Sequence, residues 1–157
     1  QQEVTLEEEL DGLEDYIYLQ QMRFDGRITV EKQILVDPAR ARLPSFTLQP
    51  VIENAFSHGL KACEEGGRIL LRVWRQGRML YVTVADNGKG MTEEELTALS
   101  EKMRQSEQTG KSIGLGNIFR RVSMLYPDTG KMQVFSRAGH GTVIRFEIPQ
   151  GEEEERA

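Results

Sequence analysis

The chain has 157 residues, which is enough for one domain with a hydrophobic core. Its 38% hydrophobic and 29% charged residues are typical of a globular protein, and no apolar run approaches the ~20 residues that span a membrane. The net charge is −5, and four glutamates and one arginine in the tail over residues 152–156 carry −3 of it. The remainder lacks the basic surface that nucleic acid partners need. The single Cys63 excludes an internal disulfide and a cysteine-rich metal site.

A helix of about five turns is expected near the N-terminus, where Thr5 and Glu8 form a capping-box pattern. An apolar stripe follows at helical spacing, and Phe24 continues it. The stripe consists of Leu6, Leu10, Leu13 and Ile17. The opposite face is acidic and must stay in water, so the stripe packs either on its own domain or on a partner helix. Periodicity alone leaves both alternatives open.

The remaining pattern predicts alternating strands and helices. Strands are expected at residues 27–36, 68–75, 79–85, 131–137 and 142–149. Helices are expected at residues 44–60, 92–103 and 115–126. In the first of these the regular part begins near Pro50, and Thr92 and Glu95 cap the second. Residues 104–112 lack periodicity and are predicted to be a mobile loop. The sum is an α/β (α+β) two-layer sandwich, a mixed and mostly antiparallel sheet with helices on one face.

Asn54 and His58 are four residues apart in a predicted helix, so their side chains face the same way. An asparagine carbonyl oxygen can bind Mg²⁺, which takes one or two protein ligands besides water and phosphate oxygens. His58 could hydrogen-bond a phosphate from the same face. Taken alone, the pair is better explained by a surface amide and a histidine near the helix C-terminus. The glycine motifs that follow favour the functional interpretation.

Asp86 ends an apolar strand and opens the glycine-containing segment over residues 86–91. A carboxylate there can accept a hydrogen bond from an exocyclic amine such as that of adenine. Gly88 and Gly90 let the backbone adopt positive φ and approach a flat ring closely. The alternative is a plain Asp-Asn-Gly hairpin turn. A capped helix follows instead of a second strand, which weakens that alternative.

Gly114, Leu115, Gly116 and Asn117 open the last predicted helix. Bare amides and the positive end of the helix dipole suit phosphate groups. The alternative is a glycine-rich helix start capped by Asn117. The motif is neither a dinucleotide-binding fingerprint nor a Walker loop. Thr142 follows the glycine turn of the last hairpin and would face the same pocket, which is the weakest of these assignments.

In combination, these motifs resemble the N box and the two glycine boxes of the GHKL ATP-binding fold. That fold is shared by gyrase, mismatch-repair MutL, Hsp-type chaperones and histidine kinases. Residues 48–55 with 58–59 look more specifically like sensor histidine kinases of the LytS/YesM type, and so do residues 6–10, 18–19 and 23–24. The resemblance covers nearly the whole chain. It implies the Bergerat (GHKL) fold, preceded by an N-terminal helix.

The resemblance also implies roles for the site residues. Asn54 would bind the Mg²⁺ that bridges the ATP phosphates, and Asp86 would bind the adenine amine. His58 and Lys61 would contact phosphate or ribose, and with Asn54 they would form the catalytic group. Thr142 would contact adenine. The other implied ATP contacts are Gly88, Gly90, Met91, Ile113, Gly114, Leu115, Gly116 and Asn117.

The resemblance further implies the organisation and partners of the chain. Residues 1–25 would end the dimerisation and phosphotransfer region, residues 26–150 would form the ATP-binding catalytic domain with a lid at 92–113, and residues 151–157 would be a disordered acidic tail. The expected partners are ATP, the phosphoaccepting helix of a dimeric full-length protein and a response regulator. Because the sequence begins with Gln1, we expect a fragment of a longer protein. The resemblance implies that this fragment is a cytoplasmic domain of a sensor located at the inner or plasma membrane, with any membrane contact made by parts outside this chain.

Two departures from the family pattern bear on the activity. Hydrolysing members carry a glutamate one helical turn before the metal-binding asparagine, and this chain has Pro50 there. Glu53 points about 100° away from Asn54 around the helix, so transfer to an external acceptor is favoured over hydrolysis. The only histidines are His58 and His140, and neither lies in a phosphoacceptor motif. We therefore expect a fragment that binds ATP without phosphorylating itself.

Three other interpretations share the fold. A conformational-clamp ATPase is disfavoured by Pro50 and by the absence of a transducer segment. An anti-sigma serine kinase usually carries the glutamate that is missing here. A degenerate, non-catalytic binding module is disfavoured by the complete set of Asn54, Asp86 and glycines. The favoured function is the ATP-binding catalytic domain of a two-component sensor histidine kinase.

Overall fold

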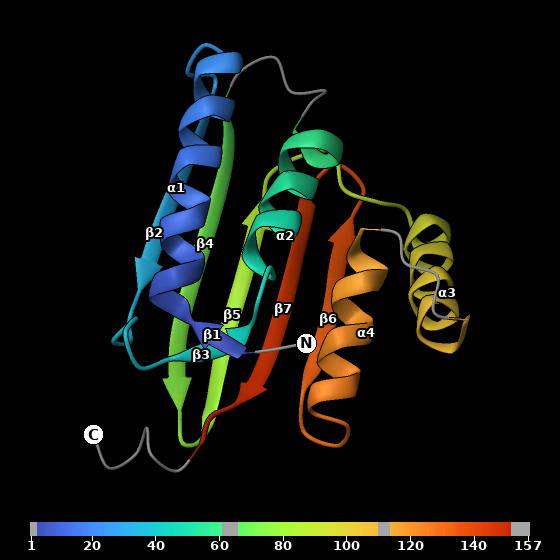
Figure 1. Cartoon of the computed structure of the whole chain (residues 1–157). Helices are drawn as coiled ribbons and strands as arrows, with labels where there is room; N and C mark the ends of the chain where they lie inside the picture. The colour runs from blue at the N-terminus through green and yellow to red at the C-terminus, as the bar shows by residue number, and fades with distance from the viewer. Residues whose placement is uncertain (1–2, 61–65, 110–113, 152–157) are drawn as a thin grey trace.

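The computed structural model describes residues 3–60, 66–109 and 114–151. One layer is a five-stranded sheet in the order β2-β4-β5-β7-β6, and helices α1, α2 and α4 cover one of its faces (Figure 1). Its strands are β2 (Ile28–Ile34), β4 (Gly67–Gln76), β5 (Met79–Asp86), β6 (Lys131–Arg137) and β7 (Gly141–Pro149). The helices are α1 (Leu6–Arg23), α2 (Leu48–Asn54), the π-helix η1 (Ala55–Gly59), α3 (Glu93–Thr109) and α4 (Leu115–Leu125). Strands β2 and β4 are parallel and the other pairs antiparallel, so the predicted fold class is confirmed.

Apolar residues at alternate positions of the central strands form the core, and the same alternation directs one polar residue toward the helices. Successive strand residues point to opposite faces of a sheet, and Leu80, Val82 and Val84 of β5 are all buried beneath the helices. Asp86 has the same parity and therefore ends the strand on the helix-covered face. It stands opposite Thr142 in the register of β5 with β7. The sheet thus delivers both residues to one end of the helical layer.

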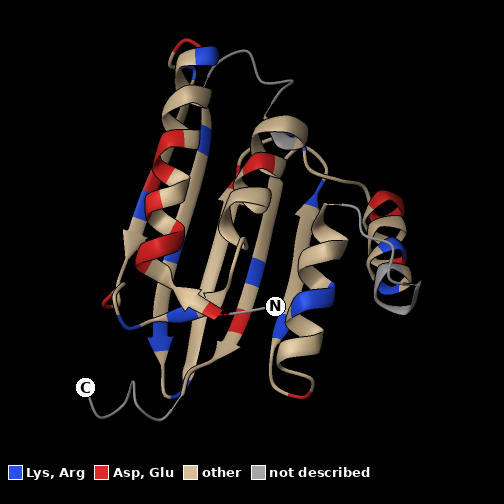
Figure 2. Ribbon diagram, in the orientation of Figure 1, with Lys and Arg blue, Asp and Glu red and all other residues tan. Residues whose placement is uncertain are grey.

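Helix α1 begins with the predicted capping box. The Thr5 hydroxyl oxygen accepts the Glu8 N–H at 3.2 Å, and the Glu8 carboxylate accepts the Thr5 N–H at 2.9 Å. Of its apolar stripe, Leu13 and Ile17 are buried in the core that they share with α2 and the sheet. The stripe therefore packs on its own domain, and the acidic face of the helix points outward (Figure 2).

We expect Leu13→Ala to lower the free energy of unfolding by about 2–4 kcal/mol, because the lost methyl groups leave a cavity in a close-packed core. The Leu13 side chain is 1% exposed, whereas Leu19 on the same helix is 61% exposed. Leu19→Ala makes the same chemical change and should cost less than about 0.5 kcal/mol. Urea unfolding of both variants measures the difference. Equal effects would show that α1 does not contribute its stripe to the core.

The structure corrects three details of the predicted elements. A small antiparallel sheet of β1 (Glu3–Thr5) and β3 (Arg42–Pro44) was not predicted, because three-residue strands carry almost no periodicity. Helix α2 begins at Leu48 instead of residue 44, since Pro44 belongs to β3; Pro50 does lie in the first turn, as predicted.

The third correction concerns residues 104–109, which are helical instead of a loop. Helix α3 runs to Thr109, beyond the predicted end at Met103. It lies outside the main helical layer, at the β6 edge (Figure 1). An exposed helix needs no apolar stripe, and arginine, glutamine and glutamate are good helix formers. The predicted mobility of residues 110–112 and the predicted disorder of residues 152–157 fall outside the described residues. Within the described ranges, no helix is both long and apolar enough to span a membrane.

Candidate functional site

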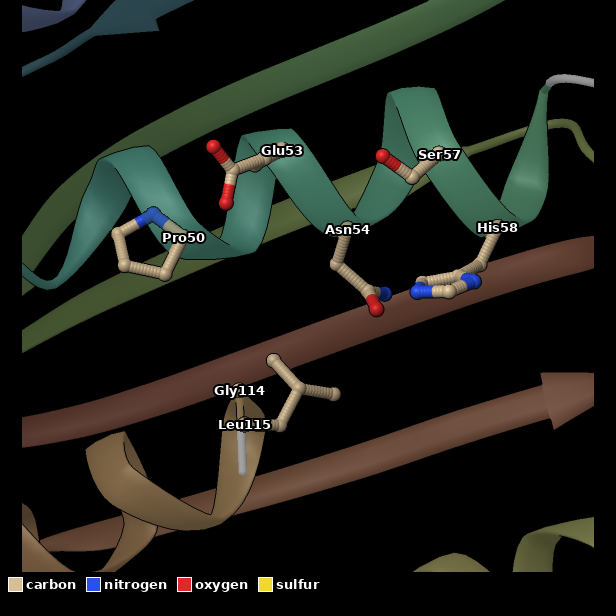
Figure 3. A pocket seen from close by; sticks show the side chains of 7 residues that line it. All are labelled: Pro50, Glu53, Asn54, Ser57, His58, Gly114 and Leu115. Atoms are coloured by element: carbon tan, nitrogen blue, oxygen red, sulfur yellow. The ribbon is translucent and has the colours of Figure 1, made fainter. Parts of the chain in front are cut away.

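A cleft of about 390 Å³ lies where α2 and η1, α3, α4 and the ends of β5 and β7 meet. Seven of the predicted site residues line it: Asn54, His58, Asp86, Gly90, Met91, Leu115 and Thr142. A smaller cavity of about 110 Å³ adjoins it and adds Gly114 (Figure 3). Residues separated by nearly ninety positions in the sequence thus share one site. The predicted Lys61 and Ile113 lie outside the described residues.

Asn54 and His58 project from the same side of their helix, as predicted. Figure 3 shows both side chains directed toward Leu115, whereas Glu53 points to the other side. The helix widens into η1 directly after Asn54, and the Leu60 N–H bonds the Ala55 carbonyl at 2.9 Å. Short π-helical turns of this kind occur frequently at functional sites.

Asp86 is a partly buried carboxylate held among hydrogen-bond donors. The Gly88 N–H donates to its Oδ1 at 2.8 Å. Burial raises the pKa of the Asp86 carboxyl above its usual value, and the backbone N–H groups of Gly88 and Thr142 lower it by a smaller amount. An acceptor that is buried at the rim of a cleft can select a ligand that presents an N–H group.

Thr142 and the 86–91 segment are joined through Ser136 on β6. The Ser136 hydroxyl lies 2.8 Å from the Thr142 hydroxyl and accepts the Met91 N–H at 2.8 Å. Thr142 itself is 9% exposed. Ser136 was not predicted, because a serine in a strand has no distinctive pattern. This network fixes the floor of the cleft around Asp86.

Gly90 has the positive φ that was predicted, at +68°. A Cβ on Gly90 would lie 2.0 Å from the Arg137 carbonyl oxygen. The structure therefore shows a close approach of this glycine to the β6–β7 hairpin, and the approach of a flat ring to it stays a prediction. The same packing explains Gly141, which has φ +93° and whose Cβ would lie 2.0 Å from the Asp86 carbonyl oxygen. The close packing of these backbone segments thus determines where the Asp86 carboxylate lies.

Helix α4 presents its N-terminus to the cleft beside Asn54 (Figure 3). Its N-cap residue is Gly114, with φ +46°, which has no side chain that could cap the first turn. The alternative that Asn117 is the cap is therefore wrong. The N–H groups at a helix N-terminus and the helix dipole together favour an anion at this point. Gly88, Gly116 and Asn117, which were also predicted to contact the ligand, are not among the described residues that line either cavity.

Several cleft residues were not predicted. Glu95, Leu99 and Lys102 come from one face of α3, and Lys89 comes from the 86–91 segment. The spacing of the three α3 residues at i, i+4 and i+7 was a readable signal, because the helix predicted at residues 92–103 already contains all three. The two lysines offset the negative charges that Asp86 and Glu95 bring to the cleft.

The donor set bears on which metal could bind. Within the described ranges, no group of three or more His, Cys, Asp or Glu side chains is placed to hold a metal ion. Asn54, whose amide oxygen is neutral, lines the cleft. Mg²⁺ is commonly held by one or two protein oxygens together with substrate phosphates, so Asn54 fits a metal that arrives with a phosphorylated ligand.

Comparison with known proteins gives concordant results. Residues 45–152 match the family model described as histidine kinase-, DNA gyrase B- and HSP90-like ATPase. The chain is 32% identical over 148 residues to the sensor histidine kinase YpdA of Escherichia coli, and the match covers 94% of this chain and 25% of YpdA. It is 30% identical over 146 residues to the sensor protein kinase HptS of Staphylococcus aureus, covering 93% of this chain and 28% of HptS. The chain thus spans about a quarter of the length of these relatives.

Solved structures show the same fold at lower identity. The catalytic domain of the histidine kinase ThkA superposes with a TM-score of 0.65 at 20% identity, covering 98% of this chain and 97% of that domain. ThkA in complex with the response regulator TrrA superposes with a TM-score of 0.60 at 18% identity, covering 99% of this chain and 43% of the ThkA chain. At 18–20% identity, this structural similarity shows a shared fold and nothing further.

Proposed function

Because the chain belongs to the family of histidine kinase-, DNA gyrase B- and HSP90-like ATPases, we propose that it is the ATP-binding catalytic domain of a two-component sensor histidine kinase. The reaction is the transfer of the ATP γ-phosphoryl group to a histidine on a helix outside this chain. The observation that carries the proposal is the single cleft that joins the Asp86 carboxylate to Asn54, His58 and the bare N-terminus of α4.

At one end of the cleft, we assign recognition of the adenine base to Asp86. Its partly buried carboxylate would accept the exocyclic amine, and Thr142 and Met91 would line the base. The hydrogen bond from Gly88 and the Ser136 network support this role by fixing the carboxylate and the Thr142 hydroxyl in place.

At the other end, we assign recognition of the phosphates to Asn54, His58 and the α4 N-terminus. Asn54 would hold Mg²⁺ together with phosphate oxygens, and the predicted contacts of Lys61 and Ile113 would add to this end. Lys102 and Lys89 would offset phosphate charge. When bound, ATP supplies the phosphoryl group, and the residues of this chain position it.

Hydrolysis by water is not the proposed reaction. Pro50, one turn before Asn54, offers no base, and Glu53 projects from a different side of the helix (Figure 3). In phosphoryl transfer the protein mainly positions groups and neutralises charge, while the acceptor provides the nucleophile. An acceptor histidine on another segment satisfies that requirement.

The proposed partners follow from the same assignment. Residues 1–25, which contain α1, would end the dimerisation and phosphotransfer region, and residues 26–150 would form the catalytic domain. The phosphorylated histidine would pass its phosphoryl group to a response regulator; ThkA, which shares the fold, has been solved in complex with one. The parent protein would be a sensor at the inner or plasma membrane, with this domain in the cytoplasm.

The test is phosphoryl transfer to a separately supplied acceptor. With Mg²⁺ and γ-labelled ATP, we expect this chain to place acid-labile, alkali-stable phosphate on the phosphoaccepting domain of YpdA and none on itself. Asn54→Ala should abolish transfer if that residue holds the metal. Rapid release of inorganic phosphate with no labelled acceptor would support the ATPase alternative, and label on this chain would contradict the expected lack of self-phosphorylation.

A further inference from the structure

Glu9 on α1 caps a different helix. Its Oε1 accepts the N–H groups of Thr47 at 2.9 Å and Leu48 at 3.0 Å, and its Oε2 accepts the Phe46 N–H at 2.7 Å. The adjacent Thr47 hydroxyl is turned away and donates to the Pro44 carbonyl at 2.6 Å. The first turn of α2 is therefore capped by a carboxylate from α1, a favourable charge at a helix N-terminus.

Arg121 on α4 holds the same segment from the other side. Its guanidinium donates to the Ser45 carbonyl at 2.6 Å and to the Phe46 carbonyl at 2.8 Å. Its buried Nε has no hydrogen-bond partner within the described ranges. Burial lowers the pKa of the Arg121 guanidinium, and the nearby Glu9 charge opposes that shift. The two charged side chains thus bond the N–H and C=O groups of one short segment.

The backbone between them is strained. Phe46 has φ +59°, a conformation that bulky residues rarely adopt. Its side chain is 54% exposed, so burial does not enforce that conformation. Strain of this kind persists only where the surroundings hold it, and here the bonds to Glu9 and Arg121 do so. An ordinary surface turn needs neither a strained backbone nor two charged side chains to hold it, which is consistent with a role of this segment in positioning the helices.

The segment over residues 45–47 is also where three helices meet. Helix α2 starts at Leu48 and carries Asn54 with His58 beyond it, while α4 carries Arg121 two turns after Gly114. These two helices form opposite walls of the smaller cavity in Figure 3. The bonds of Glu9 and Arg121 to this segment connect α2 and α4 to α1, and they therefore influence the distance between the two walls of the cavity.

Building on the proposed function, we propose that Glu9 and Arg121 are positioning residues for the nucleotide, which set α2 and α4 against α1 through residues 45–47. Neither side chain lines the cleft. Nucleotide affinity consequently depends on the position of α1, and by linkage a bound nucleotide holds α1 in its docked position. Any upstream segment that displaces α1 would thereby weaken nucleotide binding.

The experiment measures the affinity of a nonhydrolysable ATP analogue with Mg²⁺ by calorimetry, under conditions where each variant is fully folded. We expect Glu9→Ala to weaken binding about tenfold, within the usual range of coupling between sites. Glu9→Gln, which keeps one acceptor oxygen, should lose less, and Arg121→Lys should also weaken binding. In the double variant the losses should be less than additive, because both residues act on one segment.

Matched controls separate positioning from general stability. Glu7→Ala removes the same charge from α1, and Arg120→Lys makes the same change one residue along α4; both should leave the affinity within about twofold. In the nucleotide-free protein, Glu9→Ala should also speed amide hydrogen exchange at residues 54–58, and Glu7→Ala should not. If Glu9→Ala fails to fold, Glu9→Gln carries the test.

Two outcomes distinguish a failure of the positioning role from a failure of the proposed function. If the wild type binds the analogue while Glu9→Gln and Arg121→Lys bind equally well, the positioning role is wrong and the proposed function stands. If the folded wild type binds no nucleotide, the proposed function fails and this inference fails with it.

Discussion

Asp86→Asn is expected to weaken binding of an ATP analogue by about 10-fold to 100-fold, because a hydrogen bond to a charged group contributes about 1.5–3 kcal/mol and 1.4 kcal/mol corresponds to tenfold. The carboxylate already faces the N–H groups of Gly88 and Thr142. An adenine amine would bring a further donor. Asparagine offers one acceptor oxygen in place of two, so its own amide N–H groups would oppose a donor. Calorimetric titration measures the loss.

The stability of the Asp86→Asn variant can show whether its loss of nucleotide affinity comes from misfolding. Burial raises the pKa of Asp86 in the folded state. The folded protein therefore binds the proton more tightly than the unfolded chain, and the contribution of Asp86 to stability is lost as the pH rises through the folded-state pKa. At neutral pH the ionised, buried carboxylate is a cost. Asp86→Asn should thus be at least as stable as the wild type in urea at pH 7, and unchanged nucleotide affinity would contradict its assignment to the base.

Gly90→Ala is expected to lower the free energy of unfolding by about 3 kcal/mol or more, from the combined cost of left-handed backbone and overpacking. Gly90 has φ +68°, and a Cβ would meet the Arg137 carbonyl oxygen at 2.0 Å and the Gly141 carbonyl oxygen at 3.0 Å. Both obstacles are backbone atoms of the β6–β7 hairpin and cannot rotate away. Urea unfolding of the nucleotide-free protein provides the measurement.

Gly77→Ala is the matched control for this prediction. Gly77 has a similar φ of +62°, but nothing lies within 4 Å of a Cβ built there. Gly77→Ala should lower the free energy of unfolding only by the cost of the left-handed backbone, about 1–2 kcal/mol. If Gly90→Ala and Gly77→Ala destabilise the protein equally, the close approach of the 86–91 segment to the hairpin is not a determinant of the fold.

Much of the fold was predictable because its elements have strong periodicity. The strands β4 and β5 alternate cleanly, and the caps at Thr5 and Thr92 were both confirmed. The short strands β1 and β3 were not predictable, because their pairing depends on contacts between residues nearly forty positions apart. The end of α3 was missed because an exposed helix has no apolar stripe to reveal it.

The site was predictable to the extent that local spacing determines geometry. Asn54 and His58 share a helix face, and Asp86 is aimed by the parity of β5, so their convergence in one cleft followed from the sequence. Ser136 was missed because tertiary packing alone brings it there. Gly90 was singled out correctly, but its neighbour is the hairpin backbone, which no local pattern indicates. Glu9 was not among the predicted functional residues, and only the tertiary structure reveals that it caps α2.

The most direct test of the central claim is calorimetric titration of a nonhydrolysable ATP analogue with Mg²⁺ into the wild-type chain, at two temperatures so that a vanishing enthalpy cannot hide binding. The cleft predicts saturable binding with one nucleotide per chain. Absence of heat at both temperatures, from protein shown to be folded by its urea transition, would contradict the assignment of this cleft to ATP.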